Sequence, residues 1–464
     1  MFKKIAITIG VIIALTITAC WTFIVLLEGR AEEELEAAQQ RLRSMGAPMT
    51  IEAILPPPIA EEDNAAILYR EATQYEEKHR NALSKAEDII WELQEGNDDE
   101  YIEIYEMDDA SLEQIREIFK TPEVIEYLSF FENTAKRPHS RRDYSSYDKN
   151  KPAEFLMPTV GTHMDGIRFL DKRSSLRFLD GERKAAVADL ETMGMIVQHA
   201  SEDKLLISQL TAVASAGMLL RNIALADRHS LLSNSEIDSI KDYISNIQHY
   251  DDIIESYDTE RLLLSEPIIE LVKSGNTTHL QHVVPDKMLQ LMRIVTPLIR
   301  WHLIRDHAYY LNATTEIRKM YQQPYHKVAH KISAFEKRLK IETKEEHFLF
   351  SSVLTVMEKI RQNALISDTT VQLTMIGLSL TQYHNDHGIY PETLDQLLPD
   401  YLRELPIDPF SGNRFIYRRE GDGYLLYSIG LNMFDDGGTP NHEGLADENE
   451  GDLVWKGRGS LVTE

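Results

Sequence analysis

The densest group of side chains that could do chemistry lies near the C-terminus, in residues 430–452. This stretch holds seven acidic residues and neither Lys nor Arg: Asp435, Asp436, Glu443, Asp447, Glu448, Glu450 and Asp452. Carboxylates held close together repel one another unless a cation lies between them. Oxygen ligands on a long loop suit calcium, and Gly430, Gly437 and Gly438 let the backbone turn its carbonyls inward. The composition predicts a calcium-binding loop, with a solvated acidic loop as the alternative.

The histidines give a weaker signal. His326 and His330 are four residues apart and share one face if the segment is helical, as metal ligands do, but Lys327 stands where a zinc protease needs glutamate. Other histidines lack even this spacing or a third ligand: His279, His282, His302 and His307. We interpret all of them as surface or structural residues.

The remaining catalytic signatures are missing from the sequence. It contains no Gly-x-Ser-x-Gly elbow, phosphate loop or dinucleotide fingerprint, and its single cysteine, Cys20, lies in an apolar run. With 75 acidic residues in the chain, paired carboxylates single out no site. We therefore expect that the chain is not an enzyme.

A helix and a small sheet are predicted around the acidic loop. Leu373, Ile376, Leu380 and Tyr383 have helical spacing and share one face, and Gly388 suits the turn that ends a helix. Pro391 is placed where a second helix would start. Strands are then expected at 414–418 and 424–428, joined by a hairpin at 420–423, and a third strand at 452–455.

This order of elements resembles the C-terminal domain of the type II secretion major pseudopilin. That family packs a short antiparallel sheet on a long helix and holds calcium between its last strands. The matching motifs are Tyr390-Pro391, Leu405-Pro406-Ile407-Asp408-Pro409-Phe410, Phe415-Ile416-Tyr417, Tyr427-Ser428-Ile429-Gly430, Asp435-Asp436-Gly437-Gly438 and Asp452-Leu453-Val454-Trp455. The resemblance covers about residues 365–460 and implies Asp435, Asp436 and Asp452 as calcium ligands, with carbonyls near Ser428 and Leu431.

The chain departs from that family at its N-terminus. It lacks the Gly-Phe-Thr-Leu-x-Glu processing signature, and a long segment separates the N-terminal apolar run from the sheet. We therefore expect that it is neither processed nor polymerised as a pilin subunit is.

The run from Ile5 to Leu27 carries no charge and is long enough, at ~1.5 Å per residue, to cross a hydrocarbon core of ~30 Å. Lys3 and Lys4 precede it and several glutamates follow, which predicts a cytoplasmic N-terminus. The alternatives are a cleaved signal peptide and a lipoprotein anchored at Cys20, within Ile17-Thr18-Ala19-Cys20. Because the apolar run continues beyond Cys20, we favour an uncleaved single-pass anchor in a bacterial inner membrane, with the bulk of the chain periplasmic.

Four regions are predicted from these patterns. Residues 1–30 form the membrane anchor, and residues 31–62 form a juxtamembrane helix followed by a proline-rich spacer around Pro56-Pro57-Pro58. Residues 63–361 read as an irregular α-helical bundle or stacked hairpins, with a possible break in the loop at 133–158. Residues 362–464 form the small pseudopilin-like α+β domain. The fold class is mainly α.

The overall charge limits the classes of molecule that the chain is expected to bind. A formal net charge of −26 argues against nucleic acid, because phosphate binding needs a basic surface. We expect an extracytoplasmic structural or interaction protein with protein partners in the cell envelope, as an accessory of a secretion or pilus-like assembly, and we identify no small-molecule substrate. The alternative is an envelope hydrolase, or a lipid or peptide carrier, with its site in the helical region.

Overall fold

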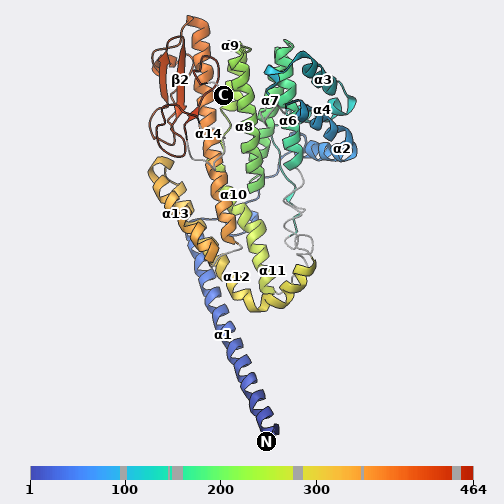
Figure 1. Cartoon of the computed structure of the whole chain (residues 1–464), viewed down its shortest axis with the longest axis vertical. Helices are drawn as coiled ribbons and strands as arrows, with labels where there is room; N and C mark the ends of the chain where they lie inside the picture. The colour runs from blue at the N-terminus through green and yellow to red at the C-terminus, as the bar shows by residue number, and fades with distance from the viewer. Residues whose placement is uncertain are drawn as a thin grey trace.

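The computed structural model describes residues 2–94, 102–144, 147–148, 160–274, 286–345, 350–440 and 451–462. It is mainly helical, with one long apolar helix at the N-terminus and a small antiparallel sheet near the C-terminus (Figure 1). The fold class predicted from the sequence is confirmed at this level. The sheet lies at one end of the molecule, and the N-terminus lies at the other (Figure 1).

The helices follow one another with short connections. In chain order they are α1 Phe2–Ser44, α2 Ala66–Gln94, α3 Asp109–Phe119, α4 Pro122–Thr134, α6 Val160–Leu179, α7 Arg183–Glu202, α8 Leu206–Arg228, α9 Asn234–Ile244, α10 Tyr250–Glu260, α11 Glu266–Ser274, α12 Asp286–Tyr321, α13 Tyr325–Glu345 and α14 Phe350–His387. A π-helical turn, Arg261–Ser265, joins α10 to α11.

Local capping signals fix many of these boundaries. The Asn64 side chain accepts a hydrogen bond from the Ala66 N–H at 3.1 Å where α2 begins. Pro122 occupies the first turn of α4, where its missing N–H leaves no bond unmade. Gly181 and Gly388 follow the ends of α6 and α14 with φ of 79° and 73°, a conformation that favours glycine.

Helix α1 has two parts with opposite surroundings. Its apolar part from Thr8 onward is exposed and is long and apolar enough to cross a membrane. Its second part buries a stripe at spacings of four, three and four residues, formed by Ala31, Leu35, Ala38 and Leu42, which joins the core around α12. One face of residues 31–44, which were predicted to form a juxtamembrane helix, is therefore part of the hydrophobic core.

The proline-rich segment that follows α1 also contacts the helical body. The Arg141 guanidinium donates a hydrogen bond to the Pro57 carbonyl at 2.9 Å. The buried Arg261 guanidinium donates to the Pro48 carbonyl. These bonds hold the backbone of residues 48–57 in place although none of these residues is buried.

Two large hydrophobic clusters form the body. One joins α2, α4, α6, α7, α8 and α9, and the other joins α1 with α10, α12, α13 and α14. Helix α14 contributes to both clusters: Met357 and Ile360 lie in the second, whereas Val371 and Leu378 lie in the first. The expected domain boundary at residue 362 therefore falls inside a continuous helix.

The C-terminal unit packs on the last turns of α14. Its sheet has the order β1-β2-β3, with β1 Ile416–Glu420, β2 Gly423–Ser428 and β3 Leu453–Val454, all antiparallel. The predicted strands match these to within two residues. The predicted face of α14 is also confirmed: Leu373, Ile376, Leu380 and the partly buried Tyr383 pack in one cluster with residues of the sheet.

One predicted element is wrong. Pro391 does not start a helix; the chain instead forms a 3₁₀ helix, Leu394–Leu397, which begins after Thr393. A capping box between Thr393 and Gln396 sets that start. The Pro391 carbonyl accepts a hydrogen bond from the Tyr417 hydroxyl at 2.6 Å, which ties this residue to the sheet.

Candidate functional site

The acidic loop leaves the end of β2 and returns to β3. Three of its glycines have positive φ: 67° at Gly430, 71° at Gly437 and 85° at Gly438. Residues with a Cβ atom rarely adopt this backbone conformation. A backbone bridge between Pro440 and Asp452, with the Asp452 N–H donating to the Thr439 carbonyl at 2.8 Å, brings the two ends of the loop together. Residues 441–450, and with them Glu443, Asp447, Glu448 and Glu450, lie outside the described residues.

Asp452 is buried, with 1% of its surface exposed. Its carboxylate accepts hydrogen bonds from the backbone N–H groups of Gly438 at 2.7 Å and Asp436 at 3.4 Å. Burial raises the pKa of the Asp452 carboxyl, the two N–H groups oppose that rise, and the charges of Asp436 and Asp435 add to it. The three predicted aspartates are therefore close enough to repel one another.

The other two aspartates have partners from the chain itself. Asp435 Oδ1 accepts from the Tyr427 hydroxyl at 2.9 Å and from the Gly437 N–H at 3.0 Å. Asp436 Oδ2 accepts from the Asn432 side-chain amide at 2.8 Å. Neutral donors of the chain thus stabilise these two carboxylates, in addition to the cation or the solvent that the sequence suggested.

The two predicted carbonyl positions lie at the base of the loop. Ser428 is buried, and its hydroxyl donates to Asp408 Oδ1 at 2.7 Å, while Leu431 is half-buried. Asp408 also accepts from the backbone N–H of Phe410 at 3.1 Å. Sequence reasoning missed this residue, although the Asp-Pro-Phe-Ser-Gly order is typical of an aspartate that bonds the backbone of its own turn.

The fit of the loop to calcium rests on both described and undescribed residues. Among the described residues, no group of three or more His, Cys, Asp or Glu side chains is arranged to hold a metal ion. The described part supplies mutually repelling carboxylates, one of them buried, on a backbone that glycine turns hold in shape. The calcium site, with Asp435, Asp436, Asp452 and the carbonyls near Ser428 and Leu431 as its expected ligands, remains a prediction.

The histidines singled out in the sequence occupy separate places. His326 is half-buried and its ring lies beside Gly412, whereas His330 is exposed on α13. His307 is buried, and burial lowers its pKa to about 3, so it is neutral in the folded protein. His302 is half-buried on α12, and His279 and His282 lie outside the described residues.

A pocket of about 350 Å³ between α2, α6 and α8 was not predicted. It is lined by Glu87, Asp88, Ile90, Trp91, Gln94, Arg168, Phe169, Lys172 and Met218. Burial, together with the nearby charge of Asp165, raises the pKa of Glu87 to about 7, and the charge of Arg168 only partly opposes this rise. None of its described lining residues is Ser, Thr, Cys or His.

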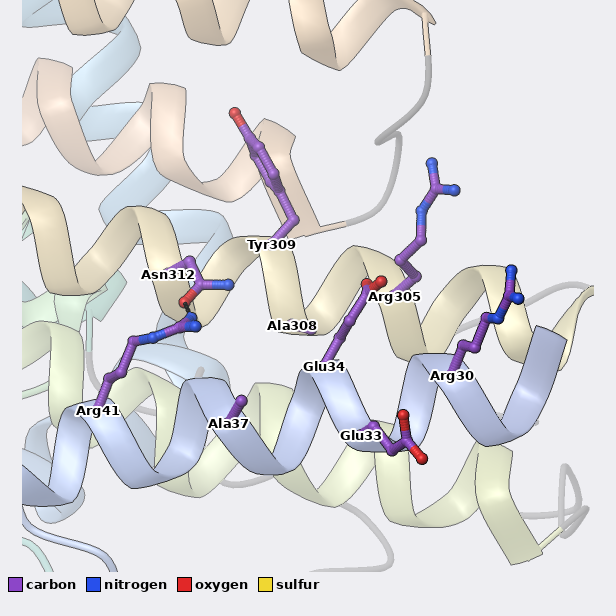
Figure 2. A pocket seen from close by; sticks show the side chains of 9 residues that line it. All are labelled: Arg30, Glu33, Glu34, Ala37, Arg41, Arg305, Ala308, Tyr309 and Asn312. Atoms are coloured by element: carbon purple, nitrogen blue, oxygen red, sulfur yellow. Dashed lines mark hydrogen bonds between the residues drawn. The ribbon is translucent and has the colours of Figure 1, made fainter. Parts of the chain in front are cut away.

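A second groove, of about 650 Å³, lies between α1 and α12. Figure 2 shows the charged side chains from both helices that line it. Sequence reasoning missed it because the two helices are far apart in the chain.

No known protein family model, curated protein or solved structure matches the chain. The class of the protein is therefore described from its fold alone. It is a mainly helical protein with one N-terminal helix compatible with a membrane anchor or a signal sequence, and a small three-stranded C-terminal unit.

Proposed function

We propose that the chain is a single-pass, extracytoplasmic structural protein of the bacterial inner membrane. In this proposal it presents a pseudopilin-like, calcium-stabilised C-terminal unit to a protein partner in a secretion or pilus-like envelope assembly. It acts by holding that unit at a fixed place above the membrane, and not by catalysis.

The continuity of α1 with the core carries this proposal. The helix that would cross the membrane continues without a break into a segment whose apolar stripe is buried against α12. The anchor and the body are therefore connected rigidly. The sheet lies at the opposite end of the body from the exposed part of α1 (Figure 1). A rigid connection of this kind sets a constant distance between the membrane and the C-terminal unit, which suits a scaffold.

The acidic loop supports a partner-binding role for that unit. Phe434 is 68% exposed at the surface of the loop, directly before Asp435. Exposed aromatic residues are enriched at protein interfaces, where they bury a large area with few rotatable bonds. Calcium would hold the carboxylates beside Phe434 in one arrangement before the partner arrives, and this lowers the entropy lost on binding.

Topology is tested with single cysteines in a Cys20→Ser background. We expect a membrane-impermeant maleimide to label Asp422→Cys in intact spheroplasts, and Lys3→Cys only after lysis. Labelling of Lys3→Cys in intact cells would contradict the orientation. Release of the whole chain from membranes by alkaline carbonate would contradict the anchor.

The interaction is tested by a photo-crosslinking amino acid placed at Phe434, with Ile341 on α13, which is 60% exposed, as the matched control. We expect a discrete crosslinked protein from position 434 that weakens when calcium is chelated, and none from position 341. Equal crosslinking from both positions would refute a specific surface at the acidic loop.

Calcium itself is tested by thermal unfolding of the full chain in detergent. We expect calcium, but not magnesium at the same concentration, to raise Tm, because a ligand that binds only the folded state stabilises it. In Asp452→Asn the rise should be lost, whereas Asp395→Asn, an exposed aspartate outside the loop, should retain it. An unchanged Tm in the wild-type protein would remove the calcium claim.

A further inference from the structure

The groove between α1 and α12 lies at a height that the anchor defines. Glu28 and Arg300 pair at 2.7 Å, and further along both helices Arg41 donates to Asn312 Oδ1 at 2.5 Å. The two helices therefore run in the same direction, and Arg300 is level with Glu28. Since the uncharged run of α1 ends at Leu27, this pair marks the boundary between the hydrocarbon and the headgroups.

The surface of α12 at this height suits a bilayer. Leu298 and Ile299, the two residues before Arg300, are 51% and 39% exposed, although both are large and apolar. Trp301 is half-buried beside them, with its indole N–H bonded to the Leu298 carbonyl at 3.1 Å. Tryptophan is enriched at membrane interfaces, and exposed aliphatic side chains next to an anchor are stable there because lipid covers them.

The groove begins directly above this apolar patch. Its lining residues are Arg30, Glu33, Glu34, Ala37 and Arg41 of α1 and Arg305, Ala308, Tyr309 and Asn312 of α12. Arg30 and Arg305 project to the same side of the two helices, and Glu34 lies on α1 between Arg30 and Arg41, pointing toward α12 (Figure 2). Arg41 is engaged by Asn312 at the end of the groove that is farther from the anchor.

We infer that this groove binds the headgroup of a zwitterionic phospholipid from the outer leaflet of the membrane. Guanidinium groups bind phosphate oxygens with charge-assisted hydrogen bonds, so Arg30 and Arg305 take the phosphate. The carboxylate of Glu34 takes the ammonium of an ethanolamine headgroup. The volume of about 650 Å³ falls in the range of small-molecule sites and admits such a group.

The charge of the whole chain favours a zwitterionic lipid over an anionic one. With a formal net charge of −26, the body is repelled by a strongly anionic surface. A headgroup without net charge avoids this repulsion and still satisfies both signs of charge in the groove. This inference rests on the proposed function, because it requires α1 to be inserted in the bilayer with the body on the outer side.

The test is native mass spectrometry of the full chain released from micelles that contain equal amounts of phosphatidylethanolamine and phosphatidylglycerol. We expect the wild-type protein to retain phosphatidylethanolamine preferentially. Arg30→Gln/Arg305→Gln should retain roughly tenfold less of it, the loss expected when charge-assisted hydrogen bonds are removed. Arg43→Gln, an exposed arginine on α1 outside the groove, is the matched control and should retain as much as the wild type.

Two further experiments distinguish a phospholipid from a free phosphate compound as the ligand of the groove. Free phosphoethanolamine and inorganic phosphate, added in excess, should not displace the lipid if the acyl chains also contact the patch at Leu298 and Ile299. Displacement by phosphate alone would reduce the site to an anion site. Glu34→Gln should shift the preference toward phosphatidylglycerol, because the partner of the ammonium is gone.

The outcomes distinguish this inference from the proposed function. Retention that is equal in the wild type and the double variant, in a protein that resists carbonate extraction, would overturn the lipid site and leave the anchor intact. Extraction of the wild-type protein by carbonate would overturn both.

Discussion

At the scale of single residues, Asp227 joins the C-terminal unit to α8. It is 1% exposed, and its Oδ2 accepts from the Arg458 N–H at 2.8 Å and from the Thr381 hydroxyl at 3.2 Å. Burial raises the pKa of the Asp227 carboxyl to about 7, and these two donors only partly oppose the rise. The folded chain therefore binds a proton at Asp227 more tightly than the unfolded chain does.

This shift gives a pH dependence with a defined sign. Because the pKa is raised on folding, the contribution of Asp227 to the free energy of unfolding is greatest below the ordinary pKa of 3.8 and falls until the pH passes about 7. The fall amounts to about 4 kcal/mol at most, at ~1.36 kcal/mol for each pKa unit. Asp227→Asn should lack this fall.

This fall in the free energy of unfolding is measured by urea unfolding of the full chain in non-ionic detergent from pH 4.5 to 8. The variant should gain stability relative to the wild type as pH rises, whereas Asp422→Asn, an exposed aspartate in the β1–β2 hairpin, should follow the wild type throughout. Parallel curves for Asp227→Asn and the wild type would show that Asp227 is already ionised in the folded protein at pH 4.5.

Gly377 is a second residue with a sharp requirement. A Cβ at this position of α14 would lie 2.2 Å from Cε2 of the buried Trp455 ring. Gly377→Ala should displace the indole and destabilise the protein by about 1–3 kcal/mol, as overpacking of a core does. Gly217→Ala on α8, where a Cβ meets no atom within 4 Å, should instead be neutral or stabilise by about 0.5–1 kcal/mol. Thermal unfolding followed by tryptophan fluorescence compares the two, and equal Tm changes would contradict the contact.

At the scale of elements, the packing of α1 against α12 decides what can be removed from the chain. Deletion of residues 2–27 removes exposed apolar surface, so the remaining protein should be soluble with an unchanged Tm. Deletion of residues 2–45 also removes Leu35 and Leu42, which are 4% and 0% exposed, and should cause aggregation or a large fall in Tm.

Single substitutions refine this prediction. Leu42→Ala should cost about 2–5 kcal/mol, since it leaves a cavity against α12, and Glu36→Ala on the exposed side of the same helix should cost little. The two variants are compared by urea unfolding. A stable protein after deletion of residues 2–45 would show that this part of α1 is only a tether.

The helices also show how much of the fold could be predicted from the sequence. Helix starts and ends at Thr121-Pro122 and Gly388 were predictable because their signals act over a few residues. The same holds for the face of α14 formed by Leu373, Ile376 and Leu380. The partner of α1 was not predictable, because α12 lies far along the chain and a helical stripe does not name what it packs against.

The candidate site was likewise predictable only in its local features. Composition alone marked the acidic loop, and glycines marked its turns. The hydrogen bonds from Tyr427 to Asp435 and from Asn432 to Asp436 could not be foreseen, because they depend on how the strand and the loop are placed in three dimensions. The groove between α1 and α12 was hidden for the same reason.

At the scale of the whole molecule, α14 makes the chain one unit. Its residues lie in all three main hydrophobic clusters: Met357 in the cluster around α12, Val371 in the cluster around α8, and Ile376 in the cluster under the sheet. The Lys241 ammonium on α9 also donates to the Tyr401 carbonyl at 2.5 Å. When the body unfolds, the C-terminal unit loses the contacts that α14 and Tyr401 make with it.

We therefore expect the body and the C-terminal unit to unfold together. With Trp21, Trp91 and Trp301 replaced by Phe, the fluorescence of Trp455 reports on the sheet, and circular dichroism at 222 nm reports on the helices. In urea the two signals should change at the same midpoint, since coincident transitions are the mark of one cooperative unit. As a further test, residues 362–464 produced alone should unfold at a lower urea concentration than the same residues in the full chain, because Val371 and Leu378 lose the partners that bury them. Separate midpoints in the full chain, or an isolated fragment of equal stability, would show that the C-terminal unit is an independent domain joined to the body only through α14.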